Sequence, residues 1–202
     1  MLKPKISFLA SHGGSSAKAI IKAIEEGKLE ASCGILITNN VDSAIHQWCI
    51  DNGFPVHHVS AATHGLAQIA DANIMSLLKE VNTDLVVCSG YMKQIGPVTL
   101  HEFSGQILNI HPALLPNHGG QGMYGDNVHK AVLKAGDKES GATVHVVTEN
   151  YDEGPTIAQS HVEVLADDTL ESLRQRVQAT EPKLYIEAIK SILSGEKNRL
   201  LS

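Results

Sequence analysis

The stretch LNIHPALLP, residues 108–116, decides how this chain is interpreted, because it places an amide and an imidazole two residues apart at the end of an apolar run. Successive side chains of a strand point to opposite faces, so Asn109 and His111 would point the same way from a strand that ends there. Pro112 then stops the regular structure and fixes where the chain leaves the strand. The stretch therefore predicts two polar side chains side by side at the mouth of a sheet.

Asp152 would bring a carboxylate to the same end of the sheet. It lies in the stretch YDEGP, residues 151–155, which follows another β-like run over Ala142–Thr148. An amide, an imidazole and a carboxylate together suit acyl transfer. Asn109 would bind a developing oxyanion, His111 would donate to it or shuttle a proton, and Asp152 would hold the imidazole charged. The alternative is a strand end fixed by prolines, with His111 as a hydrogen-bonded loop residue, and the spacing alone leaves both interpretations open.

Apolar runs alternate with amphipathic stretches along the chain, which is typical of repeated β-then-α units. The predicted strands cover Ile6–Ala10, Gly34–Thr38, Val56–Val59, Leu85–Cys88, Ile107–Ile110, Ala142–Thr148 and Thr156–Val164. The predicted helices lie around Ala19–Ile24, Asp42–Asn52, Leu66–Val81 and Asn127–Ala135, with a last helix from a capping box at Asp168 and Glu171 to about Leu193. The predicted fold is an open, mostly parallel twisted α/β sheet with helices on both faces, in a single domain over residues 1–202. Ligands of such sheets bind beyond the carboxyl ends of the strands, where the polar loops of this chain are predicted to converge.

Composition narrows the possible functions. The chain has 202 residues, 43% of them apolar, and a net charge of -6, so we expect one substantial core and no nucleic-acid partner. No charged-then-apolar signal segment and no membrane-spanning apolar run is present, which predicts no membrane association. The three cysteines have no metal spacing and lie in or beside apolar segments, as expected for buried, reduced thiols in the cytoplasm. The eleven histidines form no metal-binding motif, so no metal is expected.

The loop Ser11–Ser16 ends the first predicted strand and opens the first helix. Its glycines let the backbone approach a ligand, and the helix N-terminus offers free N–H groups to an anion. The loop has neither the lysine of a Walker A sequence nor the three-glycine spacing of a dinucleotide site, which favours a monophosphate. Gly14, Ser15 and Ser16 are therefore candidate phosphate-binding residues. The alternative is an ordinary capped helix after a glycine turn.

The string NIHPALLP followed by DEGP resembles the folate-dependent formyltransferases, and the resemblance extends from Ile6 to the last helix. It is strongest to members that transfer a formyl group from 10-formyltetrahydrofolate to the amine of glycinamide ribonucleotide, in purine biosynthesis in the cytoplasm. It implies a Rossmann-like formyltransferase fold, Asn109, His111 and Asp152 as catalytic residues, and no metal. The implied partners are glycinamide ribonucleotide and folate, with the chain acting as a monomer or a homodimer.

Further ligand-binding residues are implied only by this resemblance. The ribose phosphate would lie on Gly14–Ser16, and Glu181 would bind the amine or ribose side of the substrate. The pteridine pocket would be lined by Met92, Lys93, Gln94 and Ile95. The chain departs from the family pattern at Ser16, where Asn is usual, at Lys93, where Arg is common, and at Gln94, which replaces an apolar residue. It also has no Arg before the helix near Leu66, and the glycine-rich loop over residues 117–125 is longer than usual.

Two other functions remain open from the sequence. One is a formyltransferase that acts on another amine, such as that of an amino sugar nucleotide. The other is a non-catalytic binding protein for a phosphate ligand, which would keep the Ser11–Ser16 loop. Such a protein would not need Asn109, His111 and Asp152 together.

Overall fold

The computed structural model describes residues 3–195 and divides into two compact units after Leu108. Seven strands form one sheet in the order β3-β2-β1-β4-β5-β6-β7. β1 is parallel to β2 and β4, β2 to β3, and β4 to β5, whereas β6 and β7 are antiparallel. This arrangement confirms the predicted open, mostly parallel sheet.

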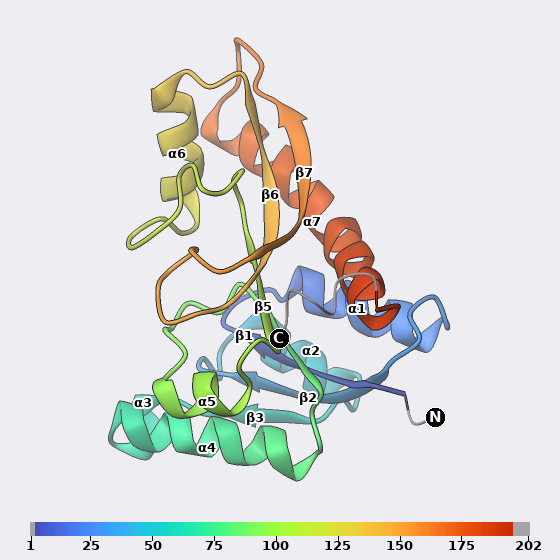
Figure 1. Cartoon of the computed structure of the whole chain (residues 1–202). Coiled ribbons are helices and arrows are strands. Elements are labelled where there is room, and N and C mark those ends of the chain that lie inside the picture. Colours follow the sequence, from blue (N-terminus) through green and yellow to red (C-terminus); the bar gives the residue numbers. More distant parts are fainter. Residues whose placement is uncertain (1–2, 196–202) are drawn as a thin grey trace. The chain divides into compact units, whose positions relative to one another are not determined.

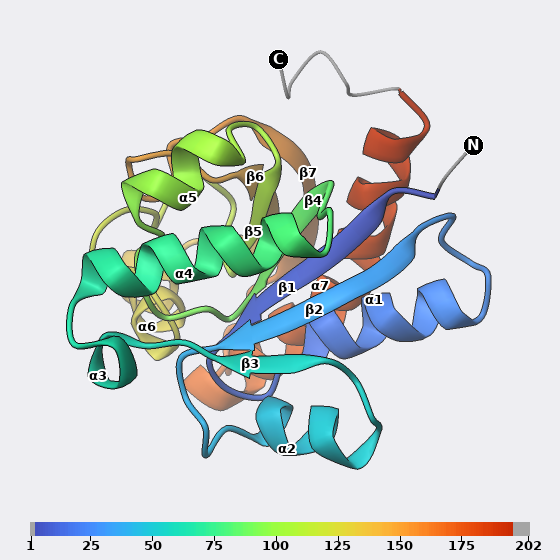
Figure 2. The same ribbon diagram turned by 90° about the horizontal axis from the view of Figure 1, so that it is seen from below.

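The first unit contains the strands that the apolar runs predict, with helices over both of their faces (Figure 2). Its elements are β1 (Lys5–Ala10), α1 (Ser15–Glu25), β2 (Ser32–Thr38), α2 (Ala44–Asp51), β3 (Val56–His58), α3 (Ala61–His64), α4 (Ala67–Glu80), β4 (Leu85–Ser89) and α5 (Pro97–Glu102). Helices α1 and α2 cover one face, and α4 and α5 cover the other (Figure 1). Strands β1 and β4 lie between these layers and, apart from Lys5 at the start of β1, are uncharged and buried, as expected for central parallel strands.

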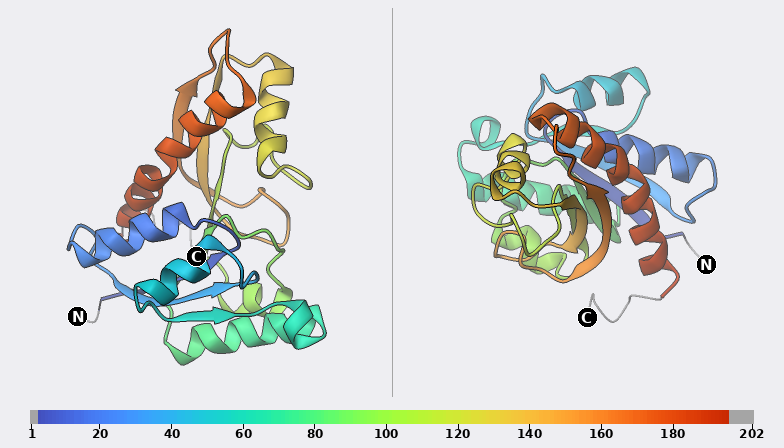
Figure 3. Two further views of the ribbon diagram at one scale, coloured as in Figure 1. Left: turned by 180° about the vertical axis from the view of Figure 1, so that it is seen from behind. Right: turned by 90° about the horizontal axis from the view of Figure 1, so that it is seen from above.

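The second unit is built on the antiparallel pair β6 and β7 (Figure 3). Its elements are the end of β5 (Ile107–His111), α6 (Asp126–Ala135), β6 (Glu139–Val146), β7 (Thr156–Glu163) and α7 (Leu170–Leu193). Pairing runs from Glu139 opposite Glu163 to His145 opposite Thr156. Helix α7 packs along both strands and also contacts α6. The loop that joins β6 to β7 therefore emerges beside His145.

Several local predictions need correction. The capping box of the last helix is formed by Thr169 and Ser172, because their side chains bond each other's backbone N–H groups. Asp168, which was predicted to cap the helix, instead accepts a hydrogen bond from the Ser172 hydroxyl and forms an ion pair with Arg176. Short helices α3 and α5 were not predicted, since neither is long enough to show a helical period.

Two further differences concern burial and strand ends. Strand β6 begins at Glu139, three residues before its predicted start, and ends at Val146 instead of Thr148. Cys49 and Cys88 are buried as predicted, but Cys33 is only half-buried, and none of the three thiols forms a disulfide. No helix among residues 3–195 is long and apolar enough to cross a membrane.

Candidate active site

Strand β5 ends at His111, directly before Pro112. Asn109 and His111 share one face of the strand, because side chains alternate along it. His111 is almost completely buried, with 3% of its surface exposed. The backbone that leaves the strand is held down by buried Thr143 of β6, whose hydroxyl donates to the Ala113 carbonyl (2.7 Å) and accepts from the Leu115 N–H (3.0 Å). Thr143 therefore fixes the exit of the chain beside the two polar side chains.

Asp152 lies in the tight loop between β6 and β7. Its backbone has φ of 60°, a left-handed conformation that Asp and Asn adopt more readily than most residues. Gly154 allows the loop to close, because a Cβ at that position would lie 1.8 Å from the Val146 carbonyl oxygen. This close approach explains why the DEGP motif has a glycine at position 154. The chain then continues into β7.

The three predicted catalytic side chains come together in the second unit. Asp152 Oδ2 lies 3.4 Å from His111 Nδ1. Asp152 Oδ1 lies 3.4 Å from Nε2 of His145, and the same nitrogen lies 3.2 Å from the Asn109 amide nitrogen. The predicted convergence of Asn109, His111 and Asp152 is therefore present, but His145 completes the connection between the amide and the carboxylate.

His145 was predicted to be a core or site-wall histidine, and the structure places it inside this network. Its Nδ1 lies 3.0 Å from the Val146 carbonyl oxygen, which can only accept, so Nδ1 carries the proton. Nε2 faces both the Asn109 amide nitrogen and Asp152 Oδ1: without a proton it accepts from the amide, and with a proton it donates to the carboxylate. The second amide N–H of Asn109 remains for another acceptor. The alternation of side chains along β6 was a signal for this residue, because His145 and Thr143 share one face.

The electrostatics of His111 differ from the expectation that Asp152 keeps it charged. Burial lowers the pKa of His111, and neither the charge of Asp152 nor the carbonyl of His118 offsets this effect, so the pKa lies below its usual value. Burial raises the pKa of Asp152. The hydrogen bond with His145, the charge of His111 and the Gly120 N–H together outweigh this effect, so the pKa of Asp152 lies below its usual value. Asp152 is therefore a carboxylate at neutral pH beside a mostly neutral His111, which makes the pair able to accept a proton.

The phosphate-loop residues belong to the first unit. Gly14 precedes α1 with φ of 59°, and a Cβ there would lie 2.6 Å from Ile45 Cγ1. The N–H of Ala17 donates to Ser89 Oγ (3.1 Å), whereas the N–H groups of Ser15 and Ser16 have no acceptor within a helix that starts at Ser15. The side chain of Ser16 is buried, so only the Ser15 hydroxyl is presented to solvent. These two N–H groups are therefore available to an anion, and phosphate binding at this loop stays a prediction.

The predicted cofactor-binding residues form the connection between β4 and α5, also in the first unit. Met92, Lys93 and Gln94 are exposed, whereas Ile95 is buried. The Met92 N–H donates to Ser11 Oγ (2.8 Å), which ties this connection to the phosphate loop within the same unit. A segment whose first three side chains are exposed and whose fourth, Ile95, is buried could line a ligand pocket. Cofactor binding by this segment stays a prediction.

Glu181 lies in α7 directly before Pro182, in the second unit. Its side chain is half-buried, and burial raises its pKa to about 7. A carboxyl that gains charge near neutral pH suits contact with an amine or a hydroxyl group, as the predicted role requires. Among residues 3–195 no group of three or more His, Cys, Asp or Glu side chains is arranged to hold a metal ion.

Comparison with known proteins gives these residues a context. The formyl transferase family matches residues 4–189. The chain therefore belongs to the formyl transferase family. It is 32% identical to the phosphoribosylglycinamide formyltransferase of Bacillus subtilis, in a match that covers 96% of this chain and 97% of that protein. The crystal structure of glycinamide ribonucleotide transformylase 1 from Symbiobacterium toebii is similar with a TM-score of 0.89 and 34% identity, over 96% of this chain and 89% of that one.

The chain is also similar to the chloroplastic phosphoribosylglycinamide formyltransferase of Arabidopsis thaliana, with 38% identity over 94% of this chain. The match spans 65% of the length of that plant protein, and 61% of its counterpart in Vigna unguiculata.

Proposed function

We propose that this protein transfers a formyl group from 10-formyltetrahydrofolate to the primary amine of glycinamide ribonucleotide, in purine biosynthesis. The observation that carries the proposal is the network of Asn109, His111, His145 and Asp152, in which both histidines are buried, in a chain of the formyl transferase family. The relatives named above bear the name of this activity. The predicted location is the cytoplasm, and the predicted assembly is a monomer or a homodimer.

The network supplies the groups that the reaction needs. The free amine of the substrate attacks the formyl carbon, a C–N bond forms, and the carbonyl oxygen becomes an oxyanion. The second amide N–H of Asn109 would stabilise that oxyanion. Asp152 and His111 would take the proton that the amine loses, and His111 would carry positive charge only while the intermediate exists. Breakage of the bond from the formyl carbon to the folate nitrogen, with proton return to that nitrogen, completes the transfer.

Binding roles follow from the remaining predicted residues. We propose that the backbone N–H groups of Gly14, Ser15 and Ser16 bind the ribose phosphate, and that Glu181 binds the amine or ribose side. We propose that the segment 92–95 lines the pteridine pocket. Lys93 and Gln94 depart from the family pattern, so this pocket would have altered contacts without losing its apolar anchor, Ile95.

A direct assay tests this proposal against its main alternative. Purified protein with 10-formyltetrahydrofolate is offered glycinamide ribonucleotide or one of a panel of amino sugar nucleotides, and tetrahydrofolate release is followed. We expect turnover with glycinamide ribonucleotide at least about a hundredfold above the panel, because a site that binds one amine leaves polar groups unpaired with another. Turnover with an amino sugar nucleotide alone would replace the proposed substrate, and nucleotide binding without turnover would favour a binding protein.

A further inference from the structure

The glycine-rich loop 117–125 bonds both members of the catalytic pair through its backbone. The Nε2–H of His111 donates to the His118 carbonyl (2.8 Å), and the Gly120 N–H donates to Asp152 Oδ2 (3.0 Å). Asp152 Oδ2 is also the oxygen that faces His111. The orientation of the imidazole and of the carboxylate therefore depends on where this loop lies.

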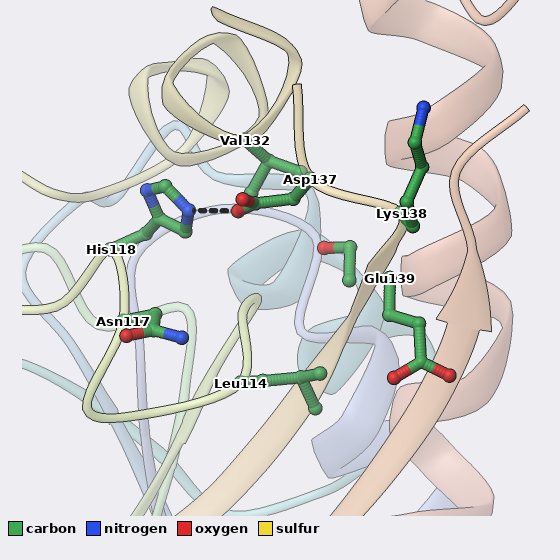
Figure 4. Close-up of a pocket in the computed structure, with 8 residues that line it drawn as sticks. Leu114, Asn117, His118, Val132, Asp137, Lys138 and Glu139 are labelled. Atoms are coloured by element: carbon green, nitrogen blue, oxygen red, sulfur yellow. Dashed lines mark hydrogen bonds and ion pairs between the residues drawn. The ribbon is translucent and has the colours of Figure 1, made fainter. Parts of the chain in front are cut away.

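The loop is anchored from its other side by the His118 side chain. His118 Nε2 lies 2.6 Å from Asp137 Oδ2, and Figure 4 shows the two side chains pointing toward each other across the edge of a cavity of about 310 Å³. Asp137 lies in the turn between α6 and β6, outside the catalytic network. His118 has φ of 55°, a conformation that side-chain-bearing residues rarely adopt without support from their contacts. A single residue thus contacts the catalytic histidine with its carbonyl and an external carboxylate with its ring.

The packing of Gly119 shows that this loop has little freedom beside Asp152. A Cβ at position 119 would lie 2.5 Å from Leu115 Cδ2 and 3.2 Å from Asp152 Cβ. The backbone between His118 and Gly120 therefore passes directly against the catalytic carboxylate. A shift at His118 would be transmitted to His111 and Asp152 over two residues.

We propose that Asp137, through its bond to His118, is a positioning residue that holds the loop 117–125 against His111 and Asp152. This inference rests on the proposed formyl transfer, because it assigns Asp137 a part in aligning that site. Asp137 contacts neither His111 nor Asp152 in the interactions of the described residues, so its effect passes through the loop backbone. The cavity beside His118 and Asp137 leaves space into which His118 can move once their bond is weakened.

The decisive variant is Asp137→Asn, which keeps the shape of the side chain and replaces the hydrogen bond from His118 to a charged carboxylate by a weaker one to a neutral amide oxygen. Glu139→Gln is the matched control, since Glu139 lines the same cavity but faces His161, at 3.7 Å. We expect Asp137→Asn to lower kcat about five- to tenfold with little change in either KM, because misaligned groups slow the chemistry more than binding. Glu139→Gln should keep wild-type kcat, and Asp137→Glu should recover most of the loss.

Two readouts do not require activity. The Gly120 amide should exchange with deuterium faster in Asp137→Asn, and the pKa of His111, followed by NMR, should fall further because its carbonyl acceptor is displaced. Unchanged kcat, Gly120 exchange and His111 titration in a folded Asp137→Asn protein would overturn the positioning role. An inactive wild-type protein whose Gly120 and His111 still respond to Asp137→Asn would instead refute formyl transfer and leave the anchor standing.

Discussion

Replacement of Asp152 by Asn should lower the pKa of His111 below its already depressed value and slow turnover. The substitution removes one negative charge 3.4 Å from His111 Nδ1 and leaves the shape of the side chain almost unchanged. Asn is well tolerated at the left-handed φ of 60° found here, so the loop backbone should keep its path. The variant therefore tests charge with little change in geometry.

The magnitude follows from the distance. Two unit charges 3.4 Å apart attract each other by about 5 kcal/mol at an effective dielectric constant of about 20, and by about 1 kcal/mol in bulk water. Since about 1.4 kcal/mol corresponds to a factor of ten, the ratio of charged to neutral His111 should fall roughly tenfold or more at a given pH. The sign is fixed, because a lost carboxylate can only make the imidazolium less stable. Loss of a general base and of this charge should lower kcat on the order of a hundredfold.

The assay combines an NMR titration of the His111 ring with steady-state kinetics. Glu153→Gln is the control, since Glu153 is the next residue of the same loop, is exposed, and bonds Asn150 instead of His111. It should leave both the titration and kcat unchanged. A His111 pKa that stays constant or rises in Asp152→Asn would show that Asp152 does not stabilise the charged ring, and unchanged kcat would make Asp152 a structural loop residue.

Four other substitutions test separate parts of the argument. Asn109→Ala removes the proposed oxyanion donor and should lower kcat about a hundred- to a thousandfold without weakening nucleotide binding, which calorimetry can check. Gly14→Ala forces a Cβ to within 2.6 Å of a neighbouring side chain at positive φ and should weaken the nucleotide at least about tenfold more than the folate, whereas Gly13→Ala, with open space around it, should bind both normally. Asp168→Asn should lower the urea midpoint at pH 7, since it removes the carboxylate that pairs with Arg176, and the difference should vanish as the wild-type carboxyl is protonated in acid, well below its ordinary pKa. The wild-type protein should lose stability as the pH rises from 4.5 to about 7, because in this range the folded chain keeps the Glu181 proton that the unfolded chain has released. Glu181→Gln should not show this loss. Equal urea midpoints for the two proteins at pH 5 and at pH 8 would contradict the raised pKa.

The fold was largely predictable because its strands carry a strong local signal. The uncharged runs of β1 and β4 predict strands buried on both faces, and they are buried. The start of β6 was placed too late because Glu139 and Ser140 look like loop residues, although pairing with β7 includes both in the strand. Short α5 depends on a distant partner, since buried Asp71 accepts from the N–H groups of Val98 and Thr99. A local sequence pattern cannot predict this helix, because the residue that stabilises it is 27 or more positions away.

The candidate site was predictable only where sequence spacing defines geometry. Asn109 and His111 are two apart in a strand, so their common direction follows from the alternation of side chains. The approach of Asp152 followed from the position of its loop after a strand. His145 was not assigned to the network, because only the pairing of β6 with its neighbours shows that its Nε2 faces both the amide and the carboxylate.

The charge of His111 shows why residue identity alone is insufficient. A carboxylate near an imidazole predicts a raised pKa, and this attraction is present at 3.4 Å. The sequence cannot show that the same ring is 97% covered by the surrounding protein, an effect that outweighs the attraction. A neutral His111 beside an ionised Asp152 can take a proton from an attacking amine, whereas a permanently charged ring could only donate. In the proposed mechanism, the depth of burial set by the end of β5 and by the loop over His111 therefore favours proton uptake by His111 before proton donation.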